Sequence, residues 1–372
     1  MRKKYGFALF SLGIVMLIAA CNNSDKSATP ETATPATDTS KAASSLYPKG
    51  PKPAWGPSIG SEMLAVLEKL KSYDAPPLET LSAGEARKNP TPARAVMDLI
   101  KENNMVVAPS ACDTIGKNIP VNGGTIHVRI YTPKTGDKFP IIVYYQGGGW
   151  VIADLDTYDA SARALAEKVN AVVVSVHYRQ APEHKFPTAH MDAFAAYQWV
   201  WKNIRELKGD SLVAVAGESA GGNLAANVSI MARDRKIRVP IHQLLIYPIA
   251  SDDMNSPSYQ EYAAAAPLNK PMMIWFMQQY LPSAGIIADP RIALVKANLK
   301  NLPPTTLITA ELDPLQSDGK SLADKLTAAG VTVNYKNYIG VTHEFFGMGL
   351  LVPQAKEAQD FAAKEIRKAF MR

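Results

Sequence analysis

The sequence predicts an α/β fold, in which a mostly parallel, twisted sheet carries helices on both faces and a helical cap. Short apolar runs alternate with helical patterns from residue 125 onward, an order typical of parallel strands joined by helices. Two segments, 57–104 and 251–281, do not fit this alternation and indicate the cap. The chain beyond its N-terminal segment, roughly 315 residues, is long enough to bury one large core with a smaller cap.

The individual elements follow from the same patterns. The apolar runs that predict strands are 125–132, 140–145, 171–177, 211–216, 242–247, 304–310 and 331–337. The helical patterns cover 158–169, 189–204, 221–232 and 318–329, with a last helix over 354–370. The first run alternates polar and apolar residues and is followed by a strand after a short polar loop, so we expect an antiparallel edge hairpin there.

The cap is expected to come from two parts of the chain. Residues 62–71 and 92–102 are amphipathic and precede the first strand, and an apolar cluster over 272–277 lies at the centre of the second segment. A cap would exclude water and shape a pocket, although ordinary packing between helix and core also accounts for the cluster. We therefore expect N-terminal cap helices over 55–115 and an α/β domain over 116–372, with a cap insertion at about 251–281.

The first 20 residues have the pattern of a secretory signal peptide. Basic residues at 2–4 precede an apolar run over 7–20, and the run ends Ile-Ala-Ala-Cys at Cys21, which resembles a bacterial lipoprotein processing site. Cleavage before Cys21 would leave a lipid-bearing N-terminus that anchors the protein to a membrane; ordinary secretion after Ala20 is the alternative. Asn22 is not the aspartate that retains lipoproteins at many inner membranes. We therefore expect a cell-envelope lipoprotein, in the outer membrane where the cell has one.

Residues 21–54 are expected to be the lipidated cysteine and a disordered tether, because Ser, Thr, Ala and Pro dominate and bulky apolar residues are almost absent. The formal charge of the chain is +6, and it falls to +3 when the three basic residues of the signal are removed. So small a charge argues against a nucleic-acid partner. With Cys21 lipidated, Cys112 has no partner for a disulfide.

A candidate nucleophile lies in residues 217–222, which read Gly-Glu-Ser-Ala-Gly-Gly between an apolar strand and a helix of small residues. Glycines on both sides of Ser219 allow a sharp turn that exposes the hydroxyl at the positive end of the helix. A serine so placed attacks a carbonyl carbon when a base takes its proton.

The base and its orienting acid are expected after Ser219, because in this type of turn the chain order is nucleophile, acid, base. His242 opens a strand, where a buried structural histidine is expected, whereas His343 lies in a loop before the last helix and is the expected base. Asp313 follows a strand and precedes a proline, and it is the expected acid. Glu311 is its rival.

The glycine-rich run over 146–150 follows an apolar strand and is expected to bind an oxyanion. Gly147, Gly148 and Gly149 allow backbone N–H groups to converge on one point, and the N–H of Ala220 adds another donor. A flexible turn or a phosphate cradle is the alternative, but no phosphate-binding motif surrounds the three glycines.

Together these motifs resemble the hormone-sensitive lipase family (family IV) of carboxylesterases, within the α/β-hydrolases. The matches are the glycine loop with its tryptophan, the run 178–184, the turn around Ser219, and Asp313-Pro-Leu followed by His343, and they span roughly residues 60–372. The resemblance implies an α/β-hydrolase fold and hydrolysis of a small-molecule carboxylic ester, with short acyl chains favoured. It implies an acyl-Ser219 intermediate formed by the triad Ser219, His343 and Asp313, and no cofactor.

Three positions depart from the family pattern. Gln146 stands where the family has a histidine, Glu218 replaces the commoner aspartate, and Glu344 follows the base where glycine is frequent. An amide could fill the loop-shaping role of that histidine, and an acidic neighbour would raise the pKa of His343. Two other functions stay open: cleavage of amides, lactones or acetylated carbohydrates by the same triad, and ligand binding without catalysis.

The remaining motifs predict no further chemistry. No zinc-binding motif or paired Cys/His cluster occurs, so we expect no metal site. His184 and His190 are expected to face solvent. The run 178–184 is expected to be structural, with Pro182 and Pro187 fixing a turn beside the site.

Overall fold

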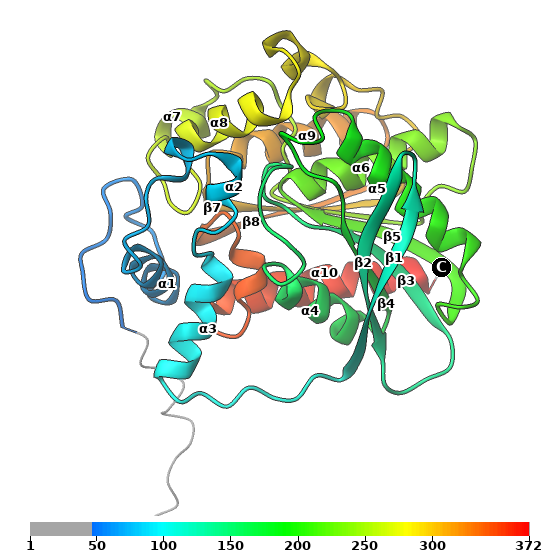
Figure 1. Cartoon of the computed structure of the whole chain (residues 1–372), viewed down its shortest axis with the longest axis horizontal. Coiled ribbons are helices and arrows are strands. Elements are labelled where there is room, and N and C mark those ends of the chain that lie inside the picture. The colour runs from blue at the N-terminus through cyan, green and yellow to red at the C-terminus, as the bar shows by residue number, and fades with distance from the viewer. Residues whose placement is uncertain (1–46, 372) are drawn as a thin grey trace, which may run out of the picture. The chain divides into compact units, whose positions relative to one another are not determined.

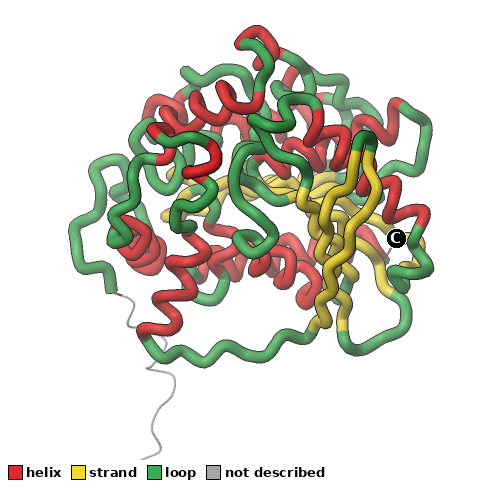
Figure 2. The backbone as a smooth tube through the Cα atoms, in the orientation of Figure 1, coloured by secondary structure: helices red, strands yellow, loops and turns green. Residues whose placement is uncertain are grey.

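An eight-stranded sheet forms the centre of the protein. The computed structural model describes residues 47–371 of the chain. The strands are β1 (Cys112–Val121), β2 (Gly124–Pro133), β3 (Phe139–Tyr145), β4 (Val172–His177), β5 (Gly209–Glu218), β6 (Gln243–Ile246), β7 (Thr305–Leu312) and β8 (Val333–Thr342). They lie in the order β1-β2-β4-β3-β5-β6-β7-β8, and β2 is antiparallel to its two neighbours while all strands from β4 onward are parallel (Figures 1 and 2).

Helices cover both faces of this sheet, as the alternation in the sequence predicts. Successive residues of β3 show it: Ile141 and Val143 pack into one hydrophobic cluster, and Ile142 and Tyr144 pack into the other. One cluster includes residues of α5 (Thr188–Lys202), α6 (Ala220–Asp234) and α9 (Gln316–Ala328), and the other includes residues of α4 (Asp159–Val169) and α10 (Pro353–Phe370). Because strand side chains alternate between faces, a strand buried on both faces needs apolar residues throughout.

Strand β1 corrects the predicted edge hairpin. The run 125–132 is an antiparallel strand, but it pairs with β1 on one side and β4 on the other, not with the following strand β3. The pairs Asn118 with His127 and Ile130 with Val174 fix its register. Most of β1 is exposed, so its sequence lacks the apolar pattern by which a strand is recognised.

The cap lies at the carboxyl ends of the strands. Its N-terminal part contains α1 (Ser61–Lys71), α2 (Ala83–Ala86) and α3 (Pro92–Glu102), and its second part contains α7 (Pro257–Glu261) and α8 (Lys270–Tyr280), with short 3-10 turns at Leu78–Thr80, Ala284–Ala288 and Leu294–Lys296. The two parts touch where the indole of Trp275 on α8 donates to the carbonyl of Leu81 at 3.1 Å. In Figure 1 the short helix α2 accordingly lies next to the yellow α8.

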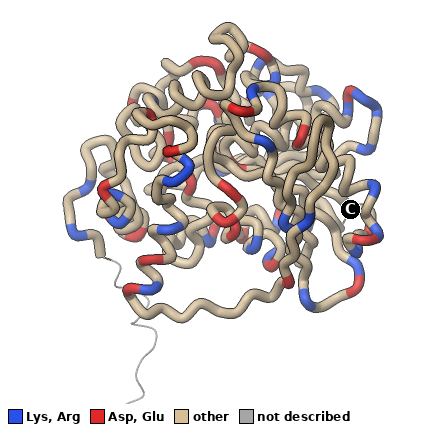
Figure 3. Tube along the Cα trace, in the orientation of Figure 1, with Lys and Arg blue, Asp and Glu red and all other residues tan. Residues whose placement is uncertain are grey.

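The predicted signal peptide and Cys21 lie outside the residues that the structure describes. The expected tether reaches into the described part, where the N–H groups of Lys49 and Gly50 both donate to the carboxylate of Glu68 on α1 at 2.7 Å. Within residues 47–371, none of the helices has the length and apolar character required to cross a membrane. Acidic and basic residues are interspersed along this part of the chain (Figure 3).

Candidate active site

Ser219 lies at the sharp turn between β5 and α6, as its motif predicts. Its backbone has φ 56° and ψ −117°, a conformation that non-glycine residues rarely adopt and that the surroundings must hold in place. A Cβ on Gly217 would collide with the carbonyl of Gly221, and one on Gly221 would collide with the carbonyl of Tyr145. The turn therefore accepts only glycine at these two positions, and it places Ser219 in the wall of a large cavity.

His343 and Asp313 are brought together although 30 residues separate them along the chain. His343 Nδ1 lies 2.7 Å from Asp313 Oδ2, and both side chains are buried. The other oxygen of Asp313 accepts the N–H of Leu315 at 2.8 Å, which fixes the carboxylate. Because Nδ1 donates to the carboxylate, the neutral imidazole keeps Nε2 as its proton acceptor. His343 also lines the cavity that contains Ser219.

The surroundings of His343 shift its pKa in opposite directions. Burial lowers the pKa of the imidazole, but the charge of Asp313 and its hydrogen bond raise it, with smaller contributions from Glu344 and Glu218. The net direction is upward. A raised pKa makes the imidazole a stronger base and stabilises its cation during proton transfer.

The rival acid and base are not at this site. Glu311 accepts the hydroxyl of Ser58 at 2.9 Å and the N–H of Gly340 at 2.7 Å, so it ties the N-terminal segment to β8. His242 is buried and its Nε2 lies 3.0 Å from Thr306 Oγ1, which gives it the structural role that was expected.

The glycine loop, residues 146–150, has an unusual backbone conformation that hydrogen bonds hold in place. Gly148, Gly149 and Trp150 have φ values of 95°, 58° and 62°, a run that is rare outside glycine. The carbonyl of Gly148 accepts the N–H groups of Val151 and Ile152, both at 3.0 Å. Other carbonyl oxygens of this loop and of its flanking residues accept hydrogen bonds from more distant side chains and one more distant amide. The donors are the Tyr178 hydroxyl to Gln146 and Gly147 (3.1 and 3.2 Å), the Ala181 N–H to Trp150 (3.0 Å), Arg87 to Val151 (2.8 Å), and Gln180 to Ile152 and Ala153 (2.7 and 2.8 Å).

These carbonyls are already hydrogen-bonded, whereas several amide N–H groups of the site are not. No hydrogen bond within residues 47–371 uses the N–H of Gly148, Gly149 or Ala220. Gly148 and Gly149 line the cavity that contains Ser219, whereas Gly147 precedes them in the chain and is not among the lining residues. Ala220 is the buried first residue of α6. Free N–H groups at a helix N-terminus and in a glycine loop form a suitable cradle for a developing negative charge.

The run 178–184 thus has the structural role that was expected, and the structure shows its target. Tyr178, Gln180 and Ala181 all bind the glycine loop through hydrogen bonds. Gln146, at the start of the loop, is buried, and its Oε1 lies 3.4 Å from His177 Nδ1. Its Nε2 has no partner among the described residues.

Two carboxylates lie beside the candidate triad and are held by tyrosines. Glu218 accepts the hydroxyl of Tyr144 at 2.5 Å and that of Tyr247, whose ring lies 4.6 Å from the imidazole of His343. Glu344 accepts the hydroxyl of Tyr158 at 3.0 Å. Burial raises the pKa of both carboxyl groups. Tyr158 was not singled out in the sequence, since it contacts Glu344 across 186 positions and no local motif marks it.

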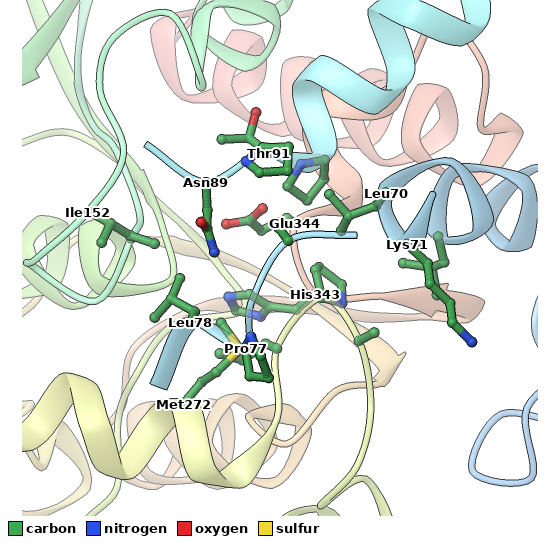
Figure 4. Close-up of a pocket in the computed structure, with 18 of the residues that line it drawn as sticks. Leu70, Lys71, Pro77, Leu78, Asn89, Thr91, Ile152, Met272, His343 and Glu344 are labelled. Atoms are coloured by element: carbon green, nitrogen blue, oxygen red, sulfur yellow. The ribbon is translucent and has the colours of Figure 1, made fainter. Parts of the chain in front are cut away.

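The cavity has a volume of about 950 Å³ and is lined in part by the cap. Met272, Met273 and Phe276 of α8 line one side, and residues of α1 and of the loop before α2 line another. Figure 4 shows His343 and Glu344 among the side chains that line it, together with Leu78 and Met272. The lining combines apolar side chains such as Leu64 and Ile249 with polar ones such as Asn89, Thr91 and Asp154.

His190 is buried, contrary to the expectation that it faces solvent, whereas His184 is exposed. His190 Nδ1 lies 2.8 Å from the Tyr280 hydroxyl and Nε2 lies 3.0 Å from Asn223 Oδ1. Burial lowers the pKa of His190 to about 4. Its helical spacing from Ala193 and Phe194 (i+3 and i+4) is the signal that places it on the buried face of α5.

Comparisons with known proteins agree with this architecture. A sequence profile of the family described as alpha/beta hydrolase fold matches residues 142–347. The chain is 42% identical to Carboxylesterase NlhH of Mycobacterium tuberculosis over 250 residues, which are 66% of this chain and 78% of the relative. It is 33% identical to an ethyl acetate hydrolase of Pseudomonas putida over 291 residues, which are 76% of this chain and 88% of the relative.

Solved structures give the same result. A thermostable esterase from Pseudomonas putida superposes with a TM-score of 0.76 at 33% identity, covering 84% of this chain and 98% of that one. An esterase of Pyrobaculum calidifontis gives 0.73 at 37% identity, covering 80% and 97%. The chain therefore belongs to the hormone-sensitive lipase family of carboxylesterases, within the α/β-hydrolase fold.

Proposed function

We propose that this protein hydrolyses short-chain carboxylic esters through an acyl intermediate on Ser219. One observation carries the proposal: Ser219, His343 and the glycine loop with its open N–H groups line one cavity, and His343 is hydrogen-bonded to Asp313 behind it. These are the nucleophile, the base with its orienting acid, and the oxyanion donors that acyl transfer needs.

In the first half of the reaction, Ser219 Oγ attacks the ester carbonyl while His343 Nε2 takes its proton. Asp313 stabilises the imidazolium cation that forms, and the N–H groups of Gly148, Gly149 and Ala220 bind the oxyanion. Collapse of this intermediate releases the alcohol, which receives the proton from His343. Water then attacks the acyl-enzyme in the same way, and the carboxylic acid leaves.

A short acyl chain fits the arrangement of the cap. Phe276 of α8 packs directly against Gly149, because a Cβ on this glycine would overlap its ring. The aromatic ring therefore forms the cavity wall next to the oxyanion donors and limits the space there. The chain's similarity to an ethyl acetate hydrolase supports the same substrate class.

The test is hydrolysis of p-nitrophenyl esters by the wild type and by Ser219→Ala. We expect kcat on the acetate to fall on the order of 10⁴-fold or more, with an unchanged circular dichroism spectrum. Ser229→Ala is the matched control, because Ser229 is a buried serine of α6, the helix that follows Ser219. Among the described residues its hydroxyl donates only to the carbonyl of Ala225, at 3.3 Å. Retained activity in Ser219→Ala would refute the proposal, and a rate maximum at long acyl chains would refute its substrate class.

We also propose that Cys21 is lipidated and anchors the protein in the cell envelope, in the outer membrane where one exists. Support comes from the basic start, apolar run and Ile-Ala-Ala-Cys ending of the first 21 residues. The polar segment that follows would let the catalytic domain stand clear of the membrane surface.

A further inference from the structure

One side chain of the cap reaches the glycine loop. Arg87 follows α2, a four-residue helix that begins with a capping box between Ser82 and Glu85. Just before it, the carbonyl of Leu81 accepts the indole N–H of Trp275 on α8. The segment that carries Arg87 is therefore held in place by both parts of the cap.

The guanidinium group of Arg87 makes four hydrogen bonds across the gap between cap and core. Its Nε donates to the carbonyl of Val151 at 2.8 Å, and Nη2 donates to the carbonyl of Ala181 at 2.7 Å. Both terminal nitrogens also bind the carboxylate of Glu183, at 2.9 and 2.6 Å. The side chain of Arg87 is 28% exposed, whereas that of Glu183 is 55% exposed.

These contacts lie next to the residues of the glycine loop that have positive φ angles. Val151 comes directly after Gly148, Gly149 and Trp150, the three residues at positive φ, and Ala181 donates its N–H to the carbonyl of Trp150. A backbone in a sparsely populated conformation persists only where its surroundings hold it. Hydrogen bonds from a charged group are about twice as strong as neutral ones, and the planar guanidinium fixes their directions.

We propose that Arg87 is a positioning residue, which holds the glycine loop in its oxyanion-binding conformation so that the cap takes part in the chemistry. The proposal rests on the proposed function, because it assigns a task within the same acyl transfer. Arg87 lines the same cavity as Ser219, but its hydrogen bonds go to the carbonyls of Val151 and Ala181 and to Glu183. It therefore acts through these carbonyls. Glu183 is exposed and contributes only the ion pair. Mutation of Glu183 therefore separates the ion pair of Arg87 from its hydrogen bonds to the two carbonyls.

The experiment compares four variants: Arg87→Ala, Arg87→Lys, Glu183→Gln and, as the matched control, Arg94→Ala. Arg94 is another cap arginine, with a side chain that is 63% exposed and an Nε that lies 3.7 Å from Asp98 Oδ2. No hydrogen bond or ion pair within residues 47–371 joins it to the glycine loop. We expect Arg87→Ala to lower kcat on p-nitrophenyl acetate about 10- to 100-fold with KM changed less than about 3-fold, because a displaced oxyanion donor weakens the transition state more than substrate binding. Arg87→Lys, which keeps the charge without the fork, should recover only part of the rate.

Glu183→Gln and Arg94→Ala should stay within about 3-fold of the wild type, since exposed ion pairs contribute little. Equal effects of Arg87→Ala and Glu183→Gln, or a loss of thermal stability without a loss of kcat, would overturn the proposal. A second readout is the rate of Ser219 labelling by a fluorophosphonate, which needs no ester substrate. If the wild type is labelled but hydrolyses no ester, the proposed function fails while the labelling rates still test Arg87; if it is not labelled, both fail.

Discussion

Replacing Asp318 by asparagine should change how stability depends on pH. Asp318 lies in the first turn of α9 and is 1% exposed. Its Oδ2 accepts the N–H groups of Ala250 and Ser251 at 3.0 and 2.9 Å, and Oδ1 has no partner among the described residues. Burial raises the pKa of this carboxyl group from 3.8 to about 7, and the charges of Asp313 and Asp253 add to the increase.

The size of the effect follows from this pKa. Between about pH 4 and 7 the folded protein keeps a proton that the unfolded chain releases, so the free energy of unfolding falls as pH rises. The difference between 3.8 and about 7 corresponds to roughly 4 kcal/mol in total. Of this, roughly 2–3 kcal/mol is lost between pH 5 and 8. Asparagine cannot ionise, so Asp318→Asn lacks this loss.

The assay is urea unfolding of wild type and variant at pH 5 and pH 8. The new amide places a donor where no acceptor lies, so the variant carries a penalty of about 1–3 kcal/mol that does not depend on pH. The expected signature is therefore relative: Asp318→Asn gains roughly 2–3 kcal/mol on the wild type from pH 5 to pH 8. Asp324→Asn, an exposed position on the same helix, is the control. Parallel curves for Asp318→Asn and the wild type would refute the reasoning.

Two further predictions concern the base and the N-terminus. In Glu344→Gln, loss of a nearby negative charge lowers the pKa of His343, and the acid limb of the pH profile of kcat/KM, which reports the neutral imidazole, moves to lower pH; a limb that stays in place contradicts the proposed electrostatic role. In Cys21→Ser, radiolabelled palmitate should no longer enter the protein, and the protein should move from the membrane to the soluble fraction. Unchanged labelling of this variant would rule out Cys21 as the lipid site.

Most of the fold was predictable because its central strands are buried on both faces. Runs such as 171–177 and 304–310 contain no charged Asp, Glu, Lys or Arg residue, and the helices between them have clear periodicity. β1 was not predictable in this way. It lies at the exposed edge and contains Gly116 and Pro120, so its pairing with β2, rather than its own composition, makes it a strand.

The candidate triad could be found because each member stands at the end of a strand in a recognisable motif. The residues that support it could not. Arg87 and Val151 are 64 positions apart, and Tyr158 and Glu344 are 186 apart, so only the tertiary structure brings each pair together. Such contacts leave no local sequence pattern, because nothing next to Arg87 or Tyr158 in the chain distinguishes it from any other arginine or tyrosine.

The side chains of α8 that line the cavity differ in what surrounds them. Phe276 abuts Gly149, so a change of its size is felt by the oxyanion donors as well as by the acyl group. Met272, one turn earlier, lines the same cavity, is partly buried, and is flexible and unbranched. Evolution or engineering can thus retune the range of accepted acids through Met272 while the chemical machinery stays intact, whereas substitutions at Phe276 trade selectivity against turnover.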